Sequence, residues 1–115
     1  MIPVLAAIAG FVAVAFGAFG AHALDGSLDE KQIGWWQTAT LYLMVHAALA
    51  TAISATDGGR FGLAAGIMLA GAALFAATLY AMALGAPRWF GAITPIGGLG
   101  MLAGWALIAW TAFKA

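Results

Sequence analysis

The stretch that decides the fold is residues 2–24, IPVLAAIAGFVAVAFGAFGAHAL, which contains no charged side chain. At about 1.5 Å per residue, a helix of this length crosses a hydrocarbon core of roughly 30 Å. Three more apolar stretches follow, at about residues 35–55, 61–84 and 94–113. None of them alternates apolar and polar residues as the strands of a membrane barrel do. The sequence therefore predicts an all-α integral membrane protein, a four-helix bundle with short loops that forms one transmembrane domain over residues 1–115.

The composition of the whole chain favours the same class. Of its 115 residues, 65% are hydrophobic and only 7% are charged, and the mean hydropathy is +1.04. A soluble domain carries about 25% charged residues, so lipid is the solvent that tolerates such a surface. The formal net charge is zero and there is no cysteine. We therefore expect membrane lipids as partners, no nucleic acid, and no disulfide or thiol chemistry.

The breaks between the apolar stretches are polar or rich in glycine and proline. Residues 25–32 are the most polar part of the chain and have room for a short interfacial turn of helix. Gly58 and Gly59 break the chain after the second stretch, Pro87 ends the third, and Pro95 suits the first turn of the fourth. Small residues around His22 resemble a signal-peptide cleavage site, but no Lys or Arg precedes the apolar run, so we do not expect cleavage.

The four cations divide evenly between the two sides of the membrane. Arg60 and Lys114 fall on the side of the two termini, and Lys31 and Arg88 fall on the other side. We call this second side the loop-one face, because it holds the loop after the first span. An even division gives no positive-inside bias. We expect cytoplasmic termini, and a mixed orientation stays open.

Small residues at four-residue spacing predict where helices pack, because they let backbones approach closely in lipid. The candidate packing glycines are Gly17, Gly20, Gly62, Gly66, Gly97, Gly98, Gly100 and Gly104. These stripes can serve packing within one chain. Alternatively one stripe, Gly62-Gly66-Ala70, faces a second protomer, so we expect a homo-oligomer.

The uncharged polar residues gather in the half of the membrane nearest the loop-one face. This half is predicted to hold His22, Gln37, Thr38, Tyr42, Thr78, Tyr80 and Thr94. Thr38, Tyr42 and His46 recur at i, i+4 and i+8, so they form one stripe on the second helix, with His46 near the midplane. A polar stripe facing lipid is costly, so the stripe is expected to face the bundle interior.

A histidine near the midplane has several possible roles. His46 could relay protons, hold a metal or anchor a ligand, or it could hydrogen-bond neighbouring helices. No membrane-embedded acid accompanies it, which favours the structural role, and two histidines are too few for a metal site. The only serines, Ser27 and Ser54, do not complete a hydrolase triad. We therefore predict a non-enzymatic protein without a cofactor or a metal.

Several motifs together resemble a known family. They are Gly17-Ala18-Phe19-Gly20-Ala21-His22, Trp36-Gln37-Thr38, Tyr42, His46, Leu79-Tyr80, Ala83-Leu84, Thr94-Pro95-Ile96-Gly97-Gly98 and Gly104-Trp105. In this order they resemble domain-of-unknown-function family 423, which contains the YgdD-like bacterial inner-membrane proteins and relatives of eukaryotic transmembrane protein 256. The resemblance implies four spans and a plasma-membrane location, the bacterial inner membrane, and it implies no activity. One departure is Ala76-Ala77-Thr78, where family members tend to show a Ser-Gly-Ser-like stretch.

These observations lead to one hypothesis about the site. We predict that seven residues form a polar pocket open towards the loop-one face: His22, Gln37, Thr38, Tyr42, His46, Tyr80 and Thr94. The pocket would bind a small or lipidic ligand or lock the helices together. Two alternatives stay open: a small transporter or channel in which His46 relays protons, and an accessory subunit of a larger membrane complex.

Overall fold

The computed structural model describes residues 1–24, 26–56 and 59–114 of the chain. It contains four long helices, α1 (Ile2–Ala23), α2 (Glu30–Ser54), α3 (Gly62–Ala83) and α4 (Thr94–Phe113), and a short 3₁₀ helix, η2 (Arg88–Ala92). The described residues contain no strand. The all-α four-helix fold predicted from the apolar stretches is confirmed.

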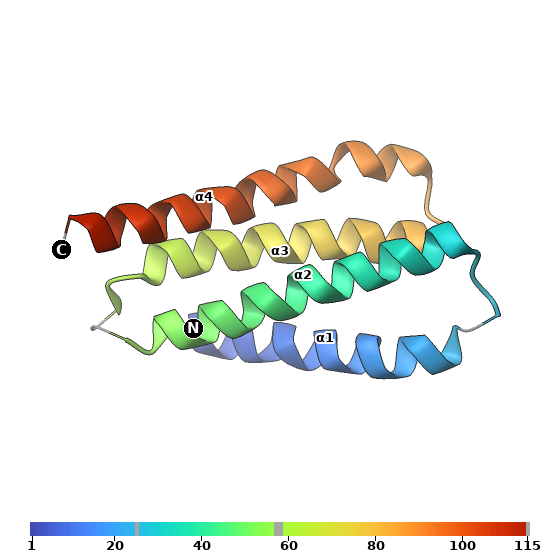
Figure 1. Ribbon diagram of the computed structural model, residues 1–115, viewed down its shortest axis with the longest axis horizontal. Helices are drawn as coiled ribbons and strands as arrows, with labels where there is room; N and C mark the ends of the chain where they lie inside the picture. Colours follow the sequence, from blue (N-terminus) through green and yellow to red (C-terminus); the bar gives the residue numbers. More distant parts are fainter. Residues whose placement is uncertain (25, 57–58, 115) are drawn as a thin grey trace.

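The helices lie side by side in chain order, so α1 and α4 form the two edges (Figure 1). α3 packs along both α2 and α4, α2 also packs along α1, and α1 meets α3 at only a few positions. Both termini lie at one end of the molecule, and the loop-one face lies at the other (Figure 1). The molecule measures 50 × 26 × 19 Å, and its longest dimension exceeds the thickness of the hydrocarbon core of a bilayer.

Three helical segments are long and apolar enough to cross a membrane by length and composition: α1, α3, and α4 together with η2. α2 has 25 residues, so it is long enough as well, but it is the least apolar of the four. α1 and α3 run in the same direction, and α2 joins the end of one to the start of the other. If α1 and α3 cross the membrane, α2 must therefore return through it.

The start of α2 lies earlier in the chain than the predicted second span. The Asp29 carboxylate accepts a hydrogen bond from the backbone N–H of Gln32 at 2.8 Å, and the Gln32 side-chain oxygen accepts one from the backbone N–H of Asp29 at 2.9 Å. This reciprocal capping box starts the helix at Glu30, before the apolar stretch begins. The polar segment is therefore partly the first turn of α2 and not a separate turn of helix.

The remaining breaks follow the sequence signals. Pro3 lies in the first turn of α1 and Pro95 in the first turn of α4, where a missing N–H is harmless. Gly85 has φ +109°, a conformation that favours glycine, and it ends α3 just before Pro87. The chain then forms η2 before α4 begins.

The core consists mainly of alanines at the helix contacts. Completely or almost completely buried examples are Ala6, Ala13, Ala39, Ala47, Ala50, Ala65, Ala72 and Ala83. Met68 is the largest side chain that is fully buried. Small side chains bring the helix axes close, and that contact drives helix association in lipid.

Candidate functional site

Three aromatic rings from three different helices meet in the half of the molecule nearest the loop-one face. Phe16 of α1, Trp36 of α2 and Tyr80 of α3 have ring centroids between 4.5 and 5.3 Å apart. We call these three residues the aromatic clamp. Stacked and edge-on contacts at these separations are favourable beyond the apolar area they bury. The clamp therefore holds α1 against α2 and α3, although α1 and α3 otherwise touch little.

Two hydrogen bonds fix the polar atoms of the clamp. Trp36 Nε1 donates to the backbone oxygen of Phe16 at 2.9 Å, and the Tyr80 hydroxyl lies 2.6 Å from the Thr40 hydroxyl. Without water in the bilayer, such groups need partners inside the protein. The clamp is thus an apolar contact whose polar atoms are paired.

Glycines of α1 make room for the clamp. A β carbon on Gly20 would overlap the indole of Trp36, lying 2.7 Å from its Cε2 atom, and a β carbon on Gly17 would lie 3.0 Å from the Thr40 methyl group. Both distances are shorter than an ordinary carbon contact. The two glycines of the motif beginning at Gly17 therefore face α2.

A pair of threonines joins α3 to α4. The hydroxyls of Thr78 and Thr94 lie 2.7 Å apart, and both residues are buried. Each hydroxyl also lies within hydrogen-bond distance of a carbonyl one turn earlier, Phe75 for Thr78 and Phe90 for Thr94. The hydroxyl that accepts from the other is the one that donates to its carbonyl, because each has a single proton. The Thr78 hydroxyl is therefore used for contact between α3 and α4.

His46 uses both of its ring nitrogens inside the protein. Its Nδ1 atom lies 2.7 Å from the backbone oxygen of Tyr42, and its Nε2 atom lies 3.1 Å from Trp105 Nε1. An indole N–H can only donate, so Nε2 accepts, and Nδ1 carries the proton that it donates to the carbonyl. This network assigns the neutral imidazole with one fixed tautomer, bridging α2 and α4.

The seven residues predicted to form one pocket lie at separate places. Tyr80 belongs to the clamp, Thr94 bonds Thr78, and His46 bonds Trp105. The other four are exposed: His22, Gln37, Thr38 and Tyr42. The Tyr42 ring packs on Phe75 at 4.9 Å and stacks on His46 at 6.2 Å.

This arrangement corrects the prediction of a single pocket. α1 and α4 lie at opposite edges, so His22 and Thr94 cannot meet even though they share the same depth. Thr38 is exposed and makes no hydrogen bond to another described residue. Depth along the membrane normal was readable from the sequence, whereas position around the bundle was not.

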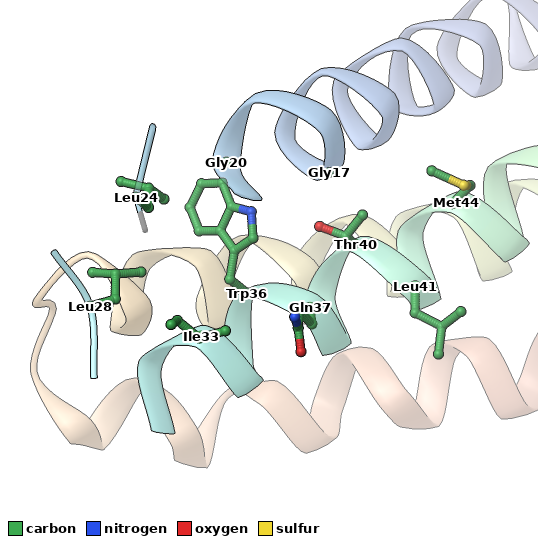
Figure 2. A pocket seen from close by; sticks show the side chains of 10 residues that line it. All are labelled: Gly17, Gly20, Leu24, Leu28, Ile33, Trp36, Gln37, Thr40, Leu41 and Met44. Carbon is green, nitrogen blue, oxygen red and sulfur yellow. The ribbon is translucent and has the colours of Figure 1, made fainter. Parts of the chain in front are cut away.

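A groove with a volume of about 460 Å³ lies between α1 and α2 near the loop-one face (Figure 2). We call it the loop-one groove. It is lined by Gly17, Gly20, Leu24, Leu28, Ile33, Trp36, Gln37, Thr40, Leu41 and Met44. Trp36 and Thr40 reach towards α1, while Gln37 and Leu41 point away from it (Figure 2). Of the seven predicted residues, Gln37 is the one that lines this groove.

The packing glycines divide into close and open positions. Gly17, Gly20, Gly97, Gly100 and Gly104 each lie where a β carbon would crowd a neighbouring helix. Gly66 has only an ordinary contact, to Ile2 at 3.5 Å. A β carbon on Gly62 or Gly98 would meet nothing within 4 Å, so these two are not packing positions within the chain.

Several contributors were missed when the site was predicted from sequence. Thr40 and Phe16 complete the clamp, Trp105 completes the His46 bridge, and Gly71 faces Gly97. One signal was available for Thr40, because it lies one helical turn after Trp36 and shares its face. No comparable signal distinguishes Gly71 from its small neighbours.

Comparison with known proteins places this architecture in a family. Residues 16–98 match the family described as "Protein of unknown function (DUF423)". That range holds the aromatic clamp, His46 and both threonines, and ends before Trp105.

Several relatives match over nearly their whole length. A UPF0382 membrane protein of Haemophilus influenzae is 42% identical over 96% of this chain and 91% of its own. The UPF0382 inner membrane protein YgdD of Escherichia coli K12 is 38% identical over 91% of this chain and 83% of its own. A UPF0382 membrane protein of Staphylococcus haemolyticus is also 38% identical, over 96% of this chain and 93% of its own. No solved structure matches the chain. With a family match over most of its residues and relatives of this similarity, the chain belongs to the DUF423 family and is a multi-pass protein of the plasma membrane, the bacterial inner membrane.

Proposed function

We propose that this protein is non-enzymatic and binds a neutral amphiphilic lipid in the loop-one groove. The observation that carries the proposal is the exposed side chain of Gln37, which lies at the α2 edge of a mainly apolar groove. Gln37 makes no hydrogen bond to another described residue, whereas Trp36 and Thr40 are both paired. An amide that faces hydrocarbon without a hydrogen-bond partner is unfavourable. A ligand head that offers a hydroxyl, ester or amide would supply that partner.

The walls of the groove suit the apolar part of such a ligand. Leucines and other apolar side chains dominate the lining, with Met44 at the deep end. Ligand sites typically combine apolar walls with a few placed polar groups. The neighbouring clamp fixes Trp36 and Thr40, so one side of the groove is formed before any ligand arrives.

The charge of the lining favours a neutral head. Among the described residues, no Asp, Glu, Lys or Arg side chain lines the groove. A charged head would leave its charge uncompensated in a region of low dielectric constant, which is strongly unfavourable. The ligand class is therefore a lipid with an uncharged hydrogen-bonding head, such as a diacylglycerol or a long-chain alcohol.

The arrangement around His46 gives no support to proton relay. A relay needs a ring nitrogen that exchanges protons with a path, yet both nitrogens here bond to fixed partners. Buried hydroxyls on α3 and α4 are likewise used between helices. Homo-oligomer formation and a place in a larger complex stay predictions.

Photo-cross-linking tests the proposal. The protein in nanodiscs is labelled with a diacylglycerol that carries a diazirine in its acyl chain, and the labelled peptides are mapped by mass spectrometry. We expect labelling to concentrate on α1 and α2 beside the loop-one groove. Gln37→Leu should lower it roughly three- to tenfold, the effect of one hydrogen bond.

Thr38→Val is the matched control, because Thr38 is the adjacent exposed residue and does not line the groove. It should leave labelling unchanged. Equal labelling of wild type and Gln37→Leu would overturn the proposal, and so would labelling spread evenly over all four helices.

A further inference from the structure

The side of α2 that faces away from α1 and α3 is open to lipid and carries polar side chains. Thr38 is exposed there, and Tyr42 is 41% exposed. α2 is also the least apolar of the four long helices, although it crosses the membrane between α1 and α3. We propose that this side of α2 is the contact surface between two copies of the chain, which form a parallel dimer. The dimer does not depend on what the loop-one groove binds.

A row of exposed residues runs along this side of α2. Its members repeat at steps of three or four residues from the first third of the helix to its last turn: Thr38, Leu41, Val45, Ala48 and Ala52. We call this row the α2 seam. Alternating steps of three and four are the spacing at which two parallel helices pack side chains into each other's gaps. The two alanines let the helix backbones approach closely, as small residues do between helices in lipid.

The hydroxyl groups favour a second copy as the partner. Neither Thr38 nor Tyr42 makes a hydrogen bond to another described residue, whereas Thr51 donates to a carbonyl of its own helix. A hydroxyl in hydrocarbon without a partner is unfavourable, and a hydroxyl on a second helix can supply one. A two-fold axis along the membrane normal places each residue opposite its own copy. Because a hydroxyl both donates and accepts, the two Thr38 side chains would satisfy each other.

Tyr42 lies beside the α2 seam and is already held in place. Its ring packs on Phe75 at 4.9 Å and stacks on His46 at 6.2 Å. Side chains of a helix lean towards its N-terminus, so the Tyr42 hydroxyl lies near the depth of Thr38, one turn earlier. In the dimer this hydroxyl joins the pair of threonines. Since the ring is ordered within one chain, the contact costs little further side-chain entropy.

The small-residue stripe on α3 is a poorer surface for a second copy. Gly62, Gly66 and Ala70 have no hydrogen-bonding side chain, and a β carbon on Gly66 would already meet Ile2 of α1 at 3.5 Å. The α2 seam combines close packing with hydroxyl groups that need partners. We therefore assign the second copy to α2 and not to the stripe on α3.

Cysteine cross-linking in membranes tests where the two copies meet. The sequence contains no cysteine, so one introduced thiol reports one position. Gly34 continues the α2 seam by one step towards the loop-one face, and a β carbon there would meet no atom within 4 Å. Gly34→Cys should therefore give a disulfide-linked dimer when the membranes are oxidised, because the two copies of this position lie close together.

Ile96→Cys is the matched control, since Ile96 is 58% exposed in the first turn of α4 at the same end of the molecule. It should stay monomeric, and so should Gly62→Cys on the α3 stripe. Equal cross-linking of Gly34→Cys and Ile96→Cys would show random collision. A dimer through Gly62→Cys alone would place the contact on α3, and either result would overturn the proposal.

Energy transfer between labelled copies of the purified protein, measured in liposomes as lipid is added, tests what holds the dimer. Ala48→Phe puts a bulky ring into the α2 seam and should weaken association roughly tenfold or more. The double variant Thr38→Val/Tyr42→Phe should weaken it roughly three- to tenfold, because hydrogen bonds between membrane helices contribute modestly. Circular dichroism should show that both variants keep the helical content of wild type.

Ala106→Phe is the matched control for the bulky substitution, because Ala106 is an exposed alanine of α4 outside the α2 seam. It should associate as wild type does. A wild type that is monomeric at every lipid content would overturn the proposal, and so would an Ala48→Phe variant that associates as strongly as wild type.

Discussion

The interface between α3 and α4 and the interface between α1 and α2 are held together in different ways. At the first, backbone meets backbone: a β carbon on Gly97 would lie 2.6 Å from the backbone oxygen of Gly71. At the second, the indole of Trp36 fills the space over Gly20. A backbone contact cannot adjust without moving a whole helix, whereas an indole can turn. The difference makes α3 and α4 the rigid half of the protein and α1 and α2 the adaptable half.

The proposed lipid site lies in the α1 and α2 half. The loop-one groove lies between α1 and α2, where the close contacts are made by side chains and not by two backbones.

The largest expected effect is that of Gly97→Ala. Its new methyl group would overlap backbone atoms of Phe75 and Gly71, so α3 and α4 would have to separate. We expect the free energy of unfolding to fall by about 2–3 kcal/mol, the usual result of overpacking. The measurement is reversible unfolding in detergent micelles followed by circular dichroism.

The neighbouring variant Gly98→Ala is the control for that prediction. A β carbon there would meet no atom within 4 Å, and alanine favours helix over glycine by up to about 1 kcal/mol. Gly98→Ala should therefore be neutral or slightly stabilising. If Gly97→Ala and Gly98→Ala have the same free energy of unfolding, the close backbone contact does not hold α3 and α4 together.

A smaller effect is expected for Gly20→Ala. The added methyl group displaces only the Trp36 indole, so we expect a loss of about 1–2 kcal/mol. Combining it with Trp36→Leu should cost less than the sum of the single changes, with a coupling of about 1 kcal/mol, because the smaller side chain removes the overlap.

Gly10→Ala on the same helix is a suitable reference, since its β carbon would make only an ordinary contact of 3.8 Å with Ala47. Additive effects of Gly20→Ala and Trp36→Leu would show that the indole does not adjust at this interface. The contrast between an adaptable and a rigid half would then fail.

The sequence predicted the helices better than their faces. The breaks at Gly85 and Pro87 and the start of α4 at Thr94 follow from residues that cannot continue a helix. The capping box from Asp29 to Gln32 was also present in the sequence, although the span was placed later. These helix starts and ends depend on neighbouring residues in the chain, so they can be predicted from short stretches of sequence.

The side of each helix that packs against its neighbours is harder to predict. A helix in lipid is apolar both on the side facing the bundle and on the side facing the membrane. Gly97 and Gly98 are adjacent and identical, yet only Gly97 touches α3. Thr78 and Thr94 were predicted at the same depth and bond to each other, whereas Thr38 at a similar depth is exposed. Depth follows from counting residues, while rotation about the helix axis depends on contacts between helices.

The smallest expected effect concerns one of the hydrogen bonds that connect the two halves, from Trp105 on α4 to His46 on α2. Trp105→Phe removes the donor and leaves His46 Nε2 without its partner. We expect a loss of about 1 kcal/mol in the free energy of unfolding, since hydrogen bonds between membrane helices contribute modestly. Trp89→Phe is the control, because Trp89 is 63% exposed on η2, and it should change stability by less than about 0.5 kcal/mol. Proton flux into liposomes, measured on the same variants, should equal that of protein-free vesicles throughout. Flux through wild type that Trp105→Phe alters would make His46 a relay, and the bridge between the rigid and adaptable halves would then be a gate and not a structural tie.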